Sequence, residues 1–233
     1  MTEAEWLTYP DPKQILEWLR DGVTCRKLRL FATGSVRQFW DLLIDERSRE
    51  AVRVAEEVAD GRESEDALDA AYRRAWDAVP QLPSDRYAHV SAARAAGRTV
   101  QNDNDAWYAS DLTVNETFGV YCDLREEEGS SDDERAYLQW VGEAETKRLL
   151  SGLLRDIFGN PFRPVAFSPS WRTSTVLALA SQMYESRDFG AMPILADALQ
   201  DAGCDSADML DHCRGPGPHV RGCWVVDVVL GKE

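Results

Sequence analysis

The sequence predicts an all-α fold, an irregular multi-helix bundle made of two packed helical lobes. Apolar residues recur at three-and-four spacing along nearly all of the chain, which is typical of amphipathic helices. Most of these stretches follow a capping residue and end at glycine or proline. Residues 223–230 are valine-rich and read equally as helix or as buried strand, but no second strand is evident to pair with them.

The N-terminal half contains a succession of helical patterns. The first follows Asp11, a capping residue, with Pro12 at the first helical position, and it ends at Gly22. The second is interrupted by Gly34 and Ser35, so it is either two helices or one kinked helix. The expected helices of this half span residues 12–22, 24–43, 48–59, 64–79 and 84–96.

The most regular amphipathic pattern lies over residues 64–79. Its apolar stripe consists of Ala67, Leu68, Ala71, Tyr72, Ala75, Trp76 and Val79. We expect this stripe to face the core. If Trp76 is fully buried, its replacement by alanine should lower the free energy of unfolding by roughly 3–5 kcal/mol.

The middle of the chain separates the two predicted lobes. Residues 98–124 mix aromatic and polar residues and read as loop with one helix. Residues 125–134 are acidic, with glycine and serine, and indicate an exposed linker. The predicted division is therefore an N-terminal lobe over 1–124, the linker over 125–134, and a C-terminal lobe over 135–233.

The C-terminal half is predicted to be helical apart from one connector. A long helix over 133–158 ends at Gly159, Asn160 and Pro161, and the prolines at 161, 164 and 169 make 162–171 an extended connector. Thr173 caps the next helix. Further helices are expected over residues 189–202, 206–213 and 220–230.

Charge and composition exclude some function classes. The formal net charge is −15, with 41 acidic and 26 basic residues, which disfavours general nucleic-acid binding and docking on anionic membranes. The same charge suits high solubility or a basic protein partner. No apolar run approaches the roughly 20 residues of a membrane helix, and no secretory pattern opens the chain. Five cysteines without such a signal predict reduced thiols and a cytoplasmic protein.

The densest cluster of chemically distinctive residues lies near the C-terminus. It consists of Cys204, His212, Cys213, His219 and Cys223. Thiolate and imidazole are preferred zinc ligands, and four of them close a tetrahedral site, so these residues are metal-ligand candidates. The alternative is that the cysteines are small core residues, since no paired CxxC motif is present. Apart from zinc, the sequence implies no cofactor. The sequence contains no phosphate loop, zincin pair or nucleophile elbow, so we predict no catalytic residue from motifs.

Arg214, His219 and Arg221 flank a glycine- and proline-rich turn and are candidates for contact with a ligand or partner. They could hold an anion or a partner's carboxylate. Alternatively, Arg221 pairs with Asp227 or Asp211 and locks the helices together. We expect the turn to be ordered, with at least one arginine hydrogen-bonded to a carboxylate of this chain, and we rank the structural lock above ligand binding.

Three stretches also carry a family resemblance. They are residues 11–32, with RKLRLFA; residues 154–164, LRDIFGNPFRP; and residues 193–227, with a motif of the type HCRxxGPHVRGCWVVD. They resemble a family of uncharacterised bacterial proteins that is expanded in planctomycetes, at both ends of the chain but not in its middle. The family has no established activity, so the resemblance implies identity without function. Its members often carry several cysteines where this chain has residues 33–36, TGSV, which implies no metal site there.

Three function hypotheses remain open. The first is a non-catalytic helical interaction or adaptor protein with an unidentified protein partner, of which an acidic inhibitor or immunity-type protein is a variant. The second is a small zinc-binding module that uses the C-terminal cysteines and histidines. The third is an enzyme of unrecognised type with His219 as base and Arg214 or Arg221 as anion holder, which alone requires a concave pocket beside His219.

Overall fold

The computed structural model describes residues 1–101, 106–128 and 131–232, with only the backbone for 126–128. Within these ranges the regular structure consists of twelve α-helices and three short 3-10 helices, so the predicted all-α fold is confirmed. The chain divides into two compact units. One is Tyr9–Ser151, called here the large unit, and the other is Met1–Thr8 with Gly152–Glu233, called here the small unit.

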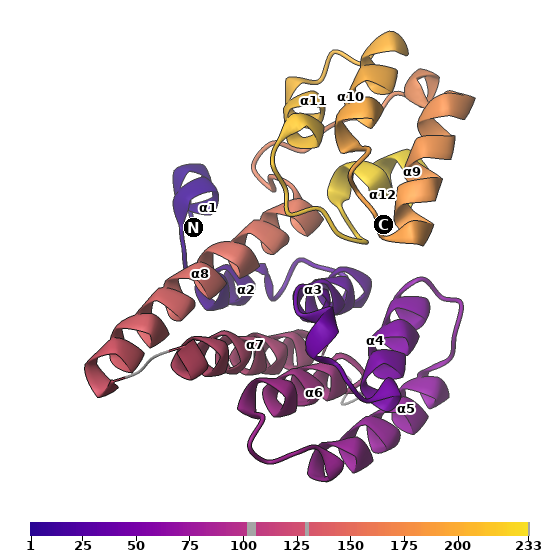
Figure 1. The fold of residues 1–233 in the computed structure, drawn as a ribbon. Coiled ribbons are helices and arrows are strands. Elements are labelled where there is room, and N and C mark those ends of the chain that lie inside the picture. The colour runs from indigo at the N-terminus through magenta and orange to yellow at the C-terminus, as the bar shows by residue number, and fades with distance from the viewer. Residues whose placement is uncertain (102–105, 129–130, 233) are drawn as a thin grey trace. The chain divides into compact units, whose positions relative to one another are not determined.

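The large unit is a stack of helices around α6 (Figure 1). Its helices are α2 (Pro12–Leu19), α3 (Cys25–Arg37), α4 (Glu46–Ala59), α5 (Glu65–Ala78), α6 (Tyr87–Thr99), α7 (Ala106–Glu128) and the first part of α8 (Asp132–Phe158), with 3-10 turns η1 (Trp40–Leu42) and η2 (Val79–Gln81). Helix α6 packs against α3, α4, α5 and α7. It is rich in buried alanine, and such small side chains let the neighbouring helix axes approach closely.

One ion pair in the large unit is strongly desolvated. Glu56 of α4 is buried and accepts two hydrogen bonds from Arg37 of α3, at 2.8 Å from Nε and 2.9 Å from an Nη atom. This bidentate geometry satisfies both carboxylate oxygens, which burial of a charge requires. The pair therefore links α4 directly to α3.

The small unit surrounds a second apolar core. Its elements are α1 (Glu3–Thr8), the last turns of α8, η3 (Pro169–Trp171), α9 (Ser174–Ser186), α10 (Met192–Asp201), α11 (Ala207–Arg214) and α12 (Trp224–Leu230). The N-terminal helix α1 is tied to α8, because Arg155 Nε donates to the carbonyl oxygen of Trp6 at 2.7 Å. The Trp6 side chain is buried, which fixes the first turn of the chain to this unit.

Several element boundaries differ from those expected. Gly34 and Ser35 do not interrupt α3, which runs through them with both residues buried. Residues 106–124, expected to be partly loop, belong to α7. Residues 125–128 of the expected linker are also in α7, and α8 begins at Asp132, with 129–130 outside the described residues.

The division between the units also lies elsewhere than expected. It falls inside α8, between Ser151 and Gly152, and residues 1–8 join the small unit. Residues 224–230, which could have been strand, form the helix α12. Trp76 is only partly buried, so the cost given above for a fully buried tryptophan does not apply to it.

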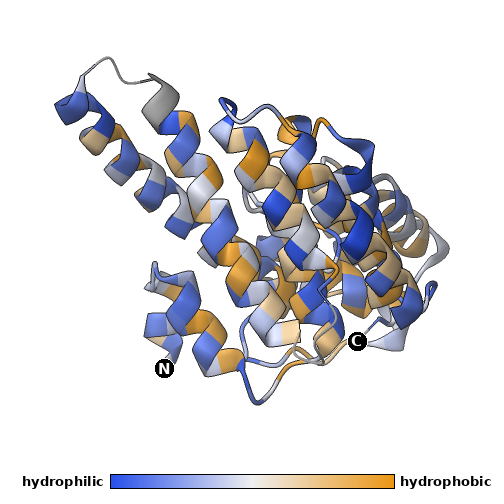
Figure 2. Ribbon diagram, turned by 90° about the horizontal axis from the view of Figure 1, so that it is seen from below, coloured by the Kyte–Doolittle hydropathy of each residue, from blue (hydrophilic) through white to orange (hydrophobic). Residues whose placement is uncertain are grey.

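Hydrophobic and hydrophilic residues alternate along the helices, as Figure 2 shows. This is the pattern of helices that bury one face and solvate the other. No described helix combines the length and the apolar character needed to cross a membrane.

Candidate metal site

Four side chains of the small unit converge on one point, although they come from separate segments. Asp156 lies in the last turn of α8, His212 near the end of α11, His219 in the turn that follows, and Cys223 at the N-cap of α12. One potential ligand atom from each residue lies within 4.8 Å of the other three. The group could therefore hold a metal ion.

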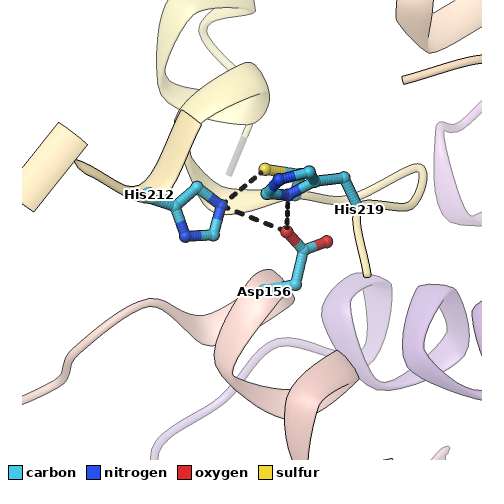
Figure 3. A group of neighbouring side chains, drawn as sticks. Asp156, His212 and His219 are labelled. Carbon is cyan, nitrogen blue, oxygen red and sulfur yellow. Dashed lines mark hydrogen bonds and ion pairs between the residues drawn. The ribbon is translucent and has the colours of Figure 1, made fainter. Parts of the chain in front are cut away.

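The contacts among the four groups are short (Figure 3). Asp156 Oδ1 lies 2.7 Å from His219 Nδ1 and 3.1 Å from His212 Nε2. The same His212 Nε2 lies 3.2 Å from the sulfur of Cys223. A tetrahedral ion with bonds of about 2.0 Å to nitrogen and oxygen and 2.3 Å to sulfur separates neighbouring ligands by roughly 3.3–3.5 Å. To admit an ion, the three short contacts would lengthen by roughly 0.2–0.6 Å, while ligand atoms now up to 4.8 Å apart would move closer together.

The site is largely shielded from water. The side chains of Asp156 and His219 are 2% and 9% exposed, and that of His212 is 19% exposed. Cys223 is fully buried. The His212 ring also contacts two aromatic rings, since its centroid lies 4.9 Å from that of His219 and 5.3 Å from that of Trp224.

Burial and hydrogen bonding act in opposite directions on Asp156. Burial alone raises the pKa of its carboxyl, but the interactions with His212 and His219 outweigh burial and leave the pKa below its ordinary value. Burial raises the pKa of the Cys223 thiol well above its ordinary value, and the nearby Asp156 charge adds to this effect. Without a cation the thiol keeps its proton, whereas a bound metal ion would replace that proton.

Local backbone features place these side chains. Gly152 lies one helical turn before Asp156 on α8, and a Cβ at this position would lie 3.2 Å from Pro218 Cδ, so glycine allows the turn to approach the helix. The backbone N–H of Val220 then donates to Asp156 Oδ2 at 3.0 Å, which orients the other oxygen toward the histidines. Gly222 has a φ of 98°, the region that favours glycine, and it turns the chain into α12.

The two other cysteine candidates lie outside this group. Cys204 and Cys213 belong to the apolar core of the small unit, where both thiols are free and buried. Burial raises the pKa of the Cys213 thiol to about 12, with a further contribution from the charge of Asp156. Both therefore act as small apolar core residues in the described arrangement.

The arginines of the turn occupy two different environments. Arg214 is exposed and binds α10, with an Nη atom 3.0 Å from Asp197 Oδ1 and 2.7 Å from Gln200 Oε1. This bond confirms the expectation that an arginine of the turn pairs with a carboxylate of the chain. Arg221 is buried, and its guanidinium carbon lies 4.7 Å from the ring centroid of Tyr184.

Sequence reasoning did not identify Asp156. It lies within a helix that contains several other acidic residues, so nothing in its spacing distinguishes it from them. It is also 56 residues before His212, counted as 212 minus 156, and therefore lies far from the C-terminal cluster in the sequence. One sequence feature could have pointed to Asp156: it lies just before the predicted helix end at Gly159, and α8 meets the turn at that end.

In comparisons with known proteins, no family model, no curated protein and no solved structure matches the chain.

Proposed function

We propose that the small unit is a zinc-binding helical module in which Asp156, His212, His219 and Cys223 hold one structural ion. The observation that supports this function is the convergence of four potential ligand atoms, from four segments, within 4.8 Å of one another. Nitrogen, oxygen and sulfur in this combination are the ligand types that zinc prefers.

The charges of the group match a divalent cation. A deprotonated Asp156 and a Cys223 thiolate carry two negative charges, and two neutral imidazoles add none. Four protein ligands complete a tetrahedral shell and leave no position for substrate, which is the arrangement of structural zinc sites rather than catalytic ones. The backbone N–H groups of Val225 and Val226 act to lower the pKa of the Cys223 thiol, against the effect of burial, and would support a metal-bound thiolate.

The same residue types could instead form a catalytic cysteine, histidine and aspartate. In such a triad the two imidazole nitrogens serve different partners, one facing the nucleophile and the other the carboxylate. Here a single atom, His212 Nε2, lies close to both Cys223 Sγ and Asp156 Oδ1. One N–H cannot donate well to both, whereas a metal ion among the three atoms would satisfy them all. Full burial of Cys223 also disfavours attack on a substrate.

A bound ion would stabilise the small unit directly. The ligands join α8, α11, the turn and α12, and none of these contacts exists in the unfolded chain, so the binding free energy adds to the folding free energy. At a free zinc concentration about 100 times the dissociation constant, this gain is about 2.7 kcal/mol.

Metal analysis of the full-length protein tests the proposal. We expect about one zinc ion per chain after purification without chelator, and loss of zinc in Cys223→Ser and His212→Ala. Replacement by Co²⁺ should give a thiolate-to-cobalt absorption band that Cys223→Ser lacks.

Two matched substitutions serve as controls. Cys204→Ser removes a buried thiol of the same core outside the group, and His89→Ala removes the third histidine of the chain. Both should retain the full zinc content and the cobalt band. Wild-type protein that takes up neither ion at micromolar concentration, or a cobalt band that persists in Cys223→Ser, would contradict the zinc function.

The interaction, inhibitor and enzyme hypotheses gain no comparable observation from the described residues and stay predictions.

A further inference from the structure

The large unit contains a cavity that the zinc function does not use. Its volume is about 680 Å³, within the range of about 300–1,000 Å³ typical of small-molecule sites. It lies among the end of α5, the segment around η2, the start of α6 and one residue of α7. All of its lining residues belong to this one unit.

Aromatic and aliphatic side chains form most of the wall. Trp76, Leu82 and Tyr87 are among the lining residues, and the Tyr87 side chain is 63% exposed. Trp76 is also packed against α6, because Gly97 lies against its indole and the guanidinium carbon of Arg98 lies 4.8 Å from its ring centroid. The indole therefore already lies in a fixed position before a ligand binds, and it offers the ligand an apolar surface.

Two opposite charges line the same cavity. Asp123 of α7 accepts a hydrogen bond from Ser91 Oγ to its Oδ2 at 2.7 Å, which fixes the carboxylate. Arg94 lies one helical turn after Ser91 on α6 and is exposed. Among the described residues Arg94 forms no hydrogen bond or ion pair, and it does not pair with Asp123. A positive and a negative group thus face one cavity while remaining separate.

We propose that this cavity binds a zwitterionic amino acid with a large apolar side chain. Arg94 would bind the carboxylate of the ligand, the free oxygen of Asp123 would accept from its ammonium group, and the apolar side chain would pack against Trp76 and Tyr87. Separate opposite charges select a ligand that carries both, because a ligand with one charge leaves the other protein group without compensation.

Calorimetric titration of the full-length protein tests the proposal. The probes are L-phenylalanine, L-leucine and L-methionine, together with two blocked forms of phenylalanine. N-acetyl-L-phenylalanine lacks the ammonium group and mimics a peptide C-terminus, while L-phenylalaninamide lacks the carboxylate and mimics a peptide N-terminus. We expect saturable binding of at least one free amino acid, and about tenfold weaker binding of each blocked form relative to free phenylalanine.

Substitutions then assign each charge. Arg94→Gln should weaken binding of the free amino acid about tenfold, and Asp123→Asn should do the same while keeping the acceptor for Ser91. Arg74→Gln, an exposed arginine on α5 outside the cavity lining, should change nothing. The proposal is overturned if none of the three amino acids binds, if a blocked form binds as tightly as phenylalanine, or if Arg94→Gln binds like the wild type.

Discussion

At the residue scale, Arg214 and Arg221 flank the same turn but contribute to stability in different ways. The Arg214 side chain is 41% exposed, and its partner Asp197 is 73% exposed, so solvent screens the ion pair. Arg221 is 4% exposed and packs over Tyr184, itself almost fully buried. A desolvated cation over an aromatic ring contributes more than a screened surface pair.

We therefore predict that Arg221→Ala destabilises the protein by roughly 2–3 kcal/mol, because it removes both the packing over Tyr184 and the interaction with the ring. Arg214→Ala should cost no more than about 1 kcal/mol. Urea denaturation of the two variants beside the wild type measures both values. Equal stability of the two variants, or unchanged unfolding of Arg221→Ala, would show that Arg221 is not the structural lock expected from the sequence.

The residues of the candidate site were predictable only in part. Histidines and cysteines are rare in this chain, so their grouping near the C-terminus pointed to His212, His219 and Cys223. The same rule nominated Cys204 and Cys213, because composition cannot distinguish a ligand from a small core residue. Asp156 was missed for the opposite reason, since one aspartate among 41 acidic residues has no distinguishing feature before the fold is known.

At the element scale, helices α5 and α6 approach each other closely where Trp76 meets Gly97. The indole of Trp76 lies directly over Gly97, where a Cβ would be 3.1 Å from Nε1 and 3.2 Å from Cε2. Such distances are below ordinary van der Waals contact, and the indole is also held by Arg98. A glycine inside a helix is normally unfavourable, so its position here is explained by packing.

Gly97→Ala should accordingly destabilise the protein by about 1–3 kcal/mol, as expected for overpacking against a rigid ring. The matched change is Gly119→Ala in α7, where the new Cβ would meet Ser91 Oγ at an ordinary 3.5 Å. That variant should be neutral or more stable by up to about 1 kcal/mol, since alanine favours helix. Thermal melting of both proteins separates the two effects. A wild-type melting curve for Gly97→Ala would be inconsistent with the packing described.

Helix α7 shows why one element was misread as partly loop. Its interior contains Ser110, Thr113 and Thr117, which read as polar interruptions in the sequence. All three are buried, and each hydroxyl donates to the carbonyl oxygen four residues earlier, at 2.8 Å in every case. Backbone acceptors within the helix thus satisfy these side chains, so they can face the core as small apolar residues do. Periodicity of apolar residues alone does not register this pattern.

At the scale of the whole molecule, the helical class was predictable and the division into units was not. Periodicity and capping residues identified most helices, because both signals are local. The boundary between the units falls within α8, a single continuous helix, and the first eight residues join the segment from Gly152 onward. Both features depend on contacts between residues distant in sequence, such as Arg155 with Trp6, which local patterns cannot indicate.

The two units should respond differently to removal of zinc. The four proposed ligands all belong to the small unit, and they join the last turns of α8 to α11 and α12. If zinc crosslinks these segments, chelation should raise their hydrogen-exchange rates, because local opening no longer has to break metal bonds. Helices α3 to α6 of the large unit contain none of the ligands and should keep their exchange rates.

Hydrogen exchange followed by mass spectrometry, with and without a strong chelator, measures this response peptide by peptide. We expect faster exchange in peptides from 152–158 and 207–230, and unchanged exchange in peptides from 25–99. Cys223→Ser should already exchange rapidly in the first set and should not respond to chelator, whereas Cys204→Ser should respond as the wild type does. A chelator effect of equal size in both sets would indicate a global change instead of a local metal crosslink. Full protection of 207–230 in the chelated wild type would mean that the buried core around Met209 and Val226 holds these helices without an ion.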